Sequence, residues 1–142
     1  MGKLTLYFHR GISKITSMFY PNVAKGSFVD HRNTVYNRKN LIMGENCNID
    51  DGATIMNTRA RFIMKRNSGA AIGLTVVTGN HMSILGMNFK QVTDEIKDKF
   101  DTKHQMDRDV VVEEDCWIAS NVTLLAGVNI GRGGGNWLRV SC

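Results

Sequence analysis

His81 is the residue whose type and position point most directly to chemistry. It stands in the run T-G-N-H-M, at the place where a regular spacing of apolar residues stops. An imidazole titrates near neutral pH, so a histidine held at such a place can accept the proton of a hydroxyl group as a general base. The competing interpretation is a loop histidine whose ring is hydrogen-bonded to backbone carbonyls. Which of the two interpretations holds depends on the structural elements that position His81.

The regular spacing is a period of six residues, clearest between Val112 and Gly134. One row of large aliphatic residues holds Val112, Ile118, Leu124 and Ile130, and a row of smaller ones holds Cys116, Val122, Val128 and Gly134. A helix spaces its apolar face at three and four residues and a strand at two, whereas a period of six requires a backbone that turns at fixed intervals. Short strands stacked into a solenoid meet this requirement, so the rows predict a parallel β-helix.

A resemblance to a known family rests on these rows. Residues 40–134 are similar to the hexapeptide-repeat acyltransferases, and most of all to the maltose and galactoside O-acetyltransferase group, through the run V-V-V-E-E-D-C-W-I-A-S-N-V-T-L-L-A-G-V-N-I-G-R-G. The resemblance implies an all-β fold, a left-handed parallel β-helix with three hexapeptides to a coil. The handedness comes from the family alone, because parallel crossovers are normally right-handed.

The period of six also predicts how the chain is organised. At 142 residues we expect a single domain over 1–142. Arg59 and Arg61 break the period, and a small bulge is expected there. The expected segments are an N-terminal capping helix at 1–21, solenoid coils at 29–81 and 110–134, an excursion loop at 82–109 and an irregular tail at 135–142. The excursion, with its charged run T-D-E-I-K-D-K-F-D-T-K, is expected to form a short helix or a mobile loop that covers a site.

The N-terminal segment has the spacing of an amphipathic helix that ends before Pro21. Its apolar residues, at intervals of three and four, are Leu4, Phe8, Ile12, Ile15 and Phe19. We expect this helix to cap the open end of the solenoid, since an uncovered strand edge invites aggregation. Binding to a membrane surface is the alternative that we favour less.

The resemblance to the acetyltransferases implies a reaction and a base. The T-G-N-H sequence is similar to the T-x-x-H of the family's catalytic histidine, which makes His81 the general base of acetyl transfer from acetyl-CoA to a hydroxyl acceptor. An acidic side chain of the excursion orients that base in the family. The matching stretch K-H-Q-M-D has no glutamate, so either Gln105 or a backbone carbonyl is expected in this role, or catalysis is weakened. Asn80 and Asn57 match positions that bind the acceptor, although asparagine also favours corners.

The same resemblance implies a cofactor groove and an oligomer. The W-I-A-S sequence at 117–120 resembles the family's W-I-G-S, so Trp117, Ala119 and Ser120 are expected to bind coenzyme A. The family's active sites lie between the subunits of a trimer, which makes a homotrimer the expected assembly. The acceptor is a small molecule with a hydroxyl group, such as a sugar, whose identity the sequence does not specify.

The composition of the chain limits which ligands, partners and cellular locations are expected. The chain has 18 basic and 13 acidic residues, a mild surplus that suits an anionic ligand such as coenzyme A. The basic residues are scattered without interleaved aromatic residues, which argues against nucleic acid. No apolar stretch approaches the roughly 18 residues of a membrane span, and we expect no membrane partner. Three cysteines without paired spacing favour a reducing compartment, hence a cytoplasmic location.

Two alternatives and one irregularity remain. A zinc-dependent carbonic anhydrase of the γ class uses the same solenoid but needs three converging histidines, and only His81 and His104 lie near each other in sequence; we expect no metal. A non-catalytic scaffold is the other alternative.

The end G-G-G-N-W-L-R-V-S-C lacks the repeat, which favours a truncated or frame-shifted form of a longer parent that binds coenzyme A weakly.

Overall fold

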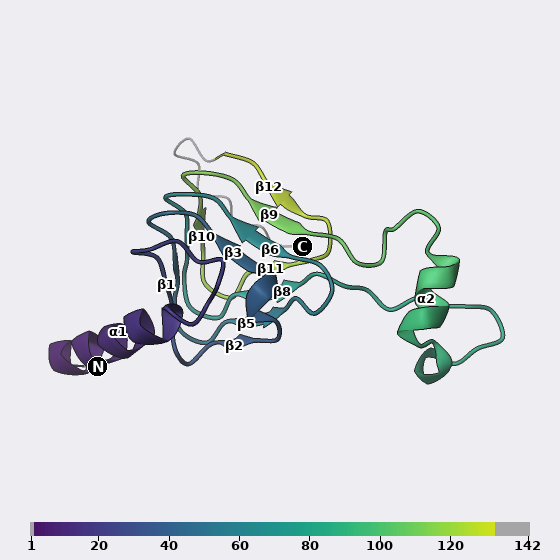
Figure 1. Ribbon diagram of the computed structural model, residues 1–142, viewed down its shortest axis with the longest axis horizontal. Helices are drawn as coiled ribbons and strands as arrows, with labels where there is room; N and C mark the ends of the chain where they lie inside the picture. The colour runs from purple at the N-terminus through teal and green to yellow at the C-terminus, as the bar shows by residue number, and fades with distance from the viewer. Residues whose placement is uncertain (1, 133–142) are drawn as a thin grey trace.

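The computed structural model describes residues 2–132 of the chain. Short strands joined by turns form the main body of this part, with α1 before them and α2 between β8 and β9 (Figure 1). The helices are α1 (Lys3–Ser17) and α2 (Asp94–Phe100), with 3-10 turns η1 (Arg38–Asn40) and η2 (Phe89–Gln91). The strands are β1 (Phe28–Val29), β2 (Thr34–Val35), β3 (Leu41–Met43), β4 (Asn48–Ile49), β5 (Thr54–Met56), β6 (Phe62–Met64), β7 (Gly69–Ala70), β8 (Thr75–Val77), β9 (Val110–Val112), β10 (Trp117–Ile118), β11 (Thr123–Leu124) and β12 (Asn129–Ile130). Gly134 of the small row and the expected tail at 135–142 lie outside the described residues.

The strands form three parallel sheets of four strands each. We call them the β1 sheet (β1-β4-β7-β10), the β2 sheet (β2-β5-β8-β11) and the β3 sheet (β3-β6-β9-β12). Successive strands of the chain join successive sheets, so the backbone passes from face to face and returns one coil higher (Figure 1). Val112 of β9 pairs with Ile130 of β12, three hexapeptides further on. The period of six in the sequence is therefore the length of one face of the solenoid.

The two rows predicted to face inward lie in one apolar core. Their buried members are Val112, Ile118, Leu124, Cys116 and Val122. Val128 and Ile130, in the last described coil, are half-buried and pack against the same core. The structure thus confirms the coarser part of the prediction, a mostly β chain whose short parallel strands stack in three sheets around a shared interior, as is consistent with a parallel β-helix.

One corner of the solenoid is built from side-chain amides that stack from coil to coil. Asn46, Asn67 and Asp115 all have positive φ, at 56°, 59° and 60°. Asparagine and aspartate tolerate this left-handed conformation better than other residues with a side chain. The Nδ2 group of Asn46 donates to Oδ1 of Asn67, and that of Asn67 donates to Oδ1 of Asp115, each at 3.1 Å. These bonds hold three consecutive corners in line.

The chain bends where Arg59 and Arg61 interrupt the period. Ala60 is buried, while the flanking arginines turn outward to acidic residues that follow much later in sequence. The Nε group of Arg61 donates to Oδ2 of Asp109 at 3.0 Å, and the Arg61 backbone N–H donates to Oδ1 at 2.8 Å. The expected irregularity is therefore the anchor point for the segment that precedes β9.

Helix α1 contacts β1 through its polar face. Oγ of Ser17 accepts the backbone N–H of Val29 at 2.9 Å, and Oγ of Ser13 accepts that of His31 at 3.1 Å. Both serines are buried, whereas Phe8 and Ile15 of the predicted apolar row are exposed. The predicted helix is present and lies against the edge strand β1 with its serine side, an orientation that the spacing of its apolar residues did not specify. Within residues 2–132, no helix has the length and apolar character needed to cross a membrane.

Residues 82–109 leave the solenoid between β8 and β9 and carry η2 and α2 away from it (Figure 1). The two ends of this excursion are joined by backbone bonds. Gly79 and Asp107 form an antiparallel bridge, the N–H of Asn80 donates to the carbonyl of Met106 at 2.7 Å, and that of Arg108 donates to Thr78 at 2.9 Å. The charged stretch that was expected as a helix or a loop contains α2, whose N-cap Thr93 accepts the N–H of Ile96.

Candidate functional site

His81 lies at the start of the excursion, directly after β8 has ended. Its side chain is exposed and borders a pocket of about 310 Å³. The walls come from β5, β8 and the excursion, and include Met56, Thr58, Val77, Asn80, Lys97 and Asp107. A rigid solenoid thus supplies one side of the pocket and the excursion supplies the other.

The imidazole of His81 packs edge-to-face on Phe89, with ring centroids 6.3 Å apart and an interplanar angle of 76°. Phe89 belongs to η2, so the excursion itself orients the ring. Within residues 2–132 no hydrogen bond joins the ring to another residue, and the backbone-bonded loop histidine finds no support there. As far as the described residues go, neither ring nitrogen is occupied by a protein partner, and a general base needs one unprotonated nitrogen open to its ligand.

Charged side chains tie α2 to the corner beside the pocket. Nζ of Lys97 lies 2.8 Å from Oδ2 of Asp107, and both side chains are largely buried. The guanidinium of Arg59 reaches Oδ1 of Asp98 at 2.6 Å and Oδ2 of Asp107 at 3.4 Å. Partly buried pairs of this kind are screened less than exposed ones. The network fixes where the excursion sits above His81.

The ion pair of Lys97 yields a direct test of this positioning. Lys97→Met should free α2 from Asp107 and raise amide hydrogen exchange over residues 94–107 about fivefold, as expected for a contact of about 1 kcal/mol. Mass-detected exchange on the purified chain measures it. Lys99→Met is the matched control, because Lys99 is exposed on the same helix and should leave exchange unchanged. Equal exchange in both variants would show that the pair does not hold α2.

Asp94 and Asp107 are the acidic residues that line the pocket, whereas Gln105, the residue predicted to orient the base, lies elsewhere. Gln105 is exposed and does not line the pocket. Its backbone N–H and that of Met106 donate to the carboxylate of Asp101, both at 2.8 Å, and these bonds lower the pKa of Asp101 from its ordinary value. This turn directs Asp107 inward. Among the described residues, Asp107 is paired with Lys97 and Arg59, and the group that orients His81 stays a prediction.

Asn80 and Asn57 have different environments. Asn80 is exposed and lines the pocket beside His81, where it can reach a ligand. Asn57 is fully buried, and its amide bonds the backbone of Asn37 in both directions, donating at 2.9 Å and accepting at 3.0 Å. The structure therefore gives Asn57 the role of joining two coils in place of the predicted acceptor contact.

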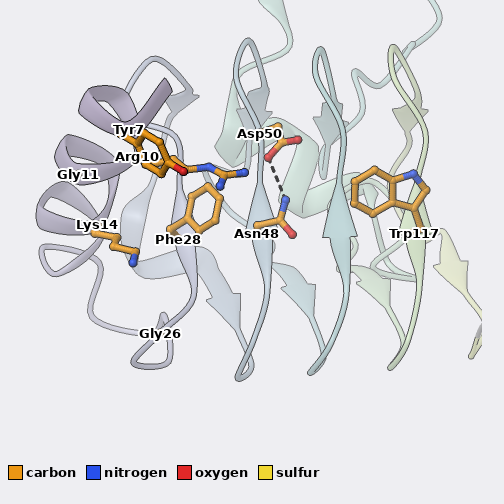
Figure 2. A pocket seen from close by; sticks show the side chains of 9 residues that line it. All are labelled: Tyr7, Arg10, Gly11, Lys14, Gly26, Phe28, Asn48, Asp50 and Trp117. Carbon is orange, nitrogen blue, oxygen red and sulfur yellow. Dashed lines mark hydrogen bonds between the residues drawn. The ribbon is translucent and has the colours of Figure 1, made fainter. Parts of the chain in front are cut away.

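Trp117 lies on the outer face of the β1 sheet, away from the His81 pocket. It borders a groove of about 710 Å³ that extends across the sheet to α1, as Figure 2 shows. Ala119 is half-buried against the core and Ser120 is exposed at the following corner. None of these three residues lines the pocket of His81. Within one chain, the predicted base and the predicted cofactor residues belong to separate surfaces.

The indole ring of Trp117 lies directly over Gly69, where there is no Cβ atom. A Cβ at Gly69 would lie 2.8 Å from Cζ3 of the Trp117 ring and 2.7 Å from Oδ1 of Asn48. Gly69→Ala should therefore lift the ring into solvent, shifting its fluorescence to longer wavelength and increasing acrylamide quenching, measured in a Trp137→Phe background. Gly131→Ala, where a Cβ meets no atom within 4 Å, is the control. Unchanged quenching in the Gly69 variant would mean that the ring does not rest on this glycine.

Comparison with protein-family models, with curated proteins and with solved structures returned no match. In the part of the chain that the structure describes, no three His, Cys, Asp or Glu side chains gather closely enough to hold a metal ion. The converging histidines that the carbonic anhydrase alternative requires are thus not found there. What the site offers is an exposed imidazole, a polar pocket and a separate aromatic groove.

Proposed function

We propose that this protein is an acetyl-CoA-dependent O-acetyltransferase of the hexapeptide-repeat acyltransferase type, with the left-handed coil of that family. One observation carries the proposal: a parallel solenoid releases its long excursion at His81 and holds that imidazole, free of protein hydrogen bonds among the described residues, beside a pocket. The family resemblance of the repeats supplies the reaction class.

In the proposed reaction, His81 accepts the proton of the acceptor hydroxyl as its oxygen attacks the thioester carbonyl. The carbon–sulfur bond then breaks, the acetyl group stays on the oxygen, and the thiolate of coenzyme A takes the proton from the imidazolium. Asn80 is placed to orient the acceptor from the same pocket. Asp107, held by Lys97 and Arg59, shapes the wall, and its charge is largely neutralised by those two cations.

A homotrimer resolves the separation of His81 from Trp117. If the excursion of one subunit lies against the β1 sheet of its neighbour, His81 meets the groove that Trp117, Ala119 and Ser120 border on the adjoining chain. Cyclic assemblies make such heterologous contacts between different faces of identical chains. The separation of the two surfaces within one chain supports this arrangement.

Release of free thiol from acetyl-CoA by the purified chain tests the activity. We expect release that depends on an added hydroxyl acceptor, assayed over sugars, amino alcohols and glycosides, with mass detection of the acetylated product. A folded chain that releases no thiol with any acceptor, while a known acetyltransferase does so in the same assay, would favour the non-catalytic scaffold.

Mixing two inactive variants tests the shared site. His81→Ala and Trp117→Ala chains, each inactive alone, should regain up to about a quarter of wild-type turnover when co-expressed, because random mixing restores that fraction of subunit junctions. Sedimentation velocity on the same samples establishes whether trimers form. Trimers without recovered turnover would place both residues in the same chain's site or exclude Trp117 from it.

A further inference from the structure

Helix α1 presents a large apolar surface to solvent. Its exposed residues, with their exposed fractions, are Leu4 (84%), Tyr7 (68%), Phe8 (65%), Ile15 (62%), and just beyond its end Met18 (82%) and Phe19 (69%). At 100° per residue, Leu4, Phe8 and Ile15 fall within one narrow sector of the helix. Scattered apolar residues on a surface are ordinary, but a continuous stripe of this size marks a binding surface.

Contacts with the solenoid fix the rotation of α1 about its axis, so the side of the helix that faces solvent is defined. Ser13 and Ser17 form the opposite side of the helix; Ser17 is hydrogen-bonded to Val29 of the edge strand β1, and Ser13 to His31 just beyond it. The ring of His9 stacks on that of His31 with centroids 5.2 Å apart and an angle of 14°. The solenoid thus holds α1 by its polar side and leaves the apolar side uncovered by any described residue.

The charge of α1 indicates what covers the stripe. The helix contains Lys3, Arg10 and Lys14 and no acidic residue. These three positions lie in one row, because they are separated by seven and four residues. Figure 2 shows Tyr7, Arg10 and Lys14 on the flank of α1 beside the groove. An apolar stripe bordered by a basic row is the pattern of helices that lie in the surface of an anionic bilayer.

We propose that α1 binds the surface of an anionic lipid bilayer and lies in its plane. Leu4, Phe8 and Ile15 enter the boundary between headgroups and acyl chains, and the basic row contacts lipid phosphates. A second copy of α1 is a poorer occupant, since pairing two such helices would bring like charges together without an acidic partner. The inference does not depend on the proposed acetyl transfer.

Co-sedimentation of the full chain with vesicles tests the proposal. We expect binding to vesicles of equal phosphatidylcholine and phosphatidylglycerol, little binding to phosphatidylcholine alone, and release by high salt. The double variant Leu4→Ser/Phe8→Ser should bind about 100-fold or more weakly, and Arg10→Gln/Lys14→Gln about 30-fold more weakly. Leu85→Ser is the control, because it removes an even more exposed apolar side chain outside α1.

All substituted side chains are exposed, so circular dichroism should show every variant to be folded. Equal binding to both kinds of vesicle, or binding unaffected by the Leu4 and Phe8 changes, overturns the proposal. Sedimentation velocity without lipid adds a second criterion. If the Leu4→Ser/Phe8→Ser variant loses an oligomer that the wild type forms, and that oligomer does not bind vesicles, the stripe belongs to contacts between copies and the proposal fails.

Discussion

Alanine in place of His81 should slow acetyl transfer by about 100- to 10,000-fold, the usual contribution of a general base. The imidazole is exposed and packs edge-to-face on Phe89 of the excursion, so its loss should leave the solenoid and the far-ultraviolet circular dichroism unchanged. Steady-state turnover with acetyl-CoA and the best acceptor measures the effect. A variant that keeps more than about a tenth of wild-type turnover would exclude His81 from proton transfer.

His104→Ala is the matched control for this prediction. His104 is also exposed and belongs to the same excursion, but it stands in the turn that Asp101 closes and does not line the His81 pocket. Its removal should change turnover much less. Equal losses in the two variants would point to a disturbed excursion as the cause, and hydrogen exchange over residues 94–107 would detect that disturbance.

The solenoid could be predicted from sequence because its pattern is local and repeated. Every face places one residue such as Ile118 or Leu124 in the core, and the same requirement returns six residues later. The break at Arg59 and Arg61 was visible for the same reason. The partners of these arginines were not, because Asp98 and Asp109 are brought to them only when the excursion has folded back.

The orientation of α1 could not be predicted. An amphipathic spacing shows that one face of a helix is apolar, but it does not show whether the rest of the chain or a binding partner covers that face. The deciding contacts are the hydroxyls of Ser13 and Ser17, which satisfy backbone N–H groups at the open edge of β1. A strand edge needs hydrogen-bond acceptors as much as apolar cover, and the polar face supplies them.

The role of His81 stays a prediction, but its place could be read from the sequence, because the period of six stops beside it. The places of Gln105 and Asp107 relative to the pocket depend on a turn closed by Asp101 and on the bridge from Gly79 to Asp107, neither of which has a sequence signature. Asn57 shows the limit of motif matching, since its position resembled that of a binding residue while its environment is structural.

Replacing Ile118 with aspartate should abolish cooperative folding. The side chain of Ile118 is buried in the apolar core, and its strand β10 pairs with β7 of the preceding coil. An unpaired carboxylate in such surroundings costs several kcal/mol, a large share of the total stability of about 5–15 kcal/mol of a domain this size. Urea unfolding followed by circular dichroism measures the loss, and we expect no folded baseline at neutral pH.

The control is Thr123→Asp, which introduces the same charge at an exposed position of β11, the next strand along the chain. It should change the free energy of unfolding by less than about 0.5 kcal/mol. The pH dependence identifies the cause. Burial raises the pKa of a carboxyl group in the folded chain above its unfolded value, so the penalty applies fully above that raised pKa and shrinks as the pH falls through it. The Ile118→Asp variant should therefore regain structure on mild acidification relative to Thr123→Asp. A variant as stable as wild type at neutral pH would mean that Ile118 does not face the core, and the inward rows on which the parallel β-helix rests would have to be reassigned.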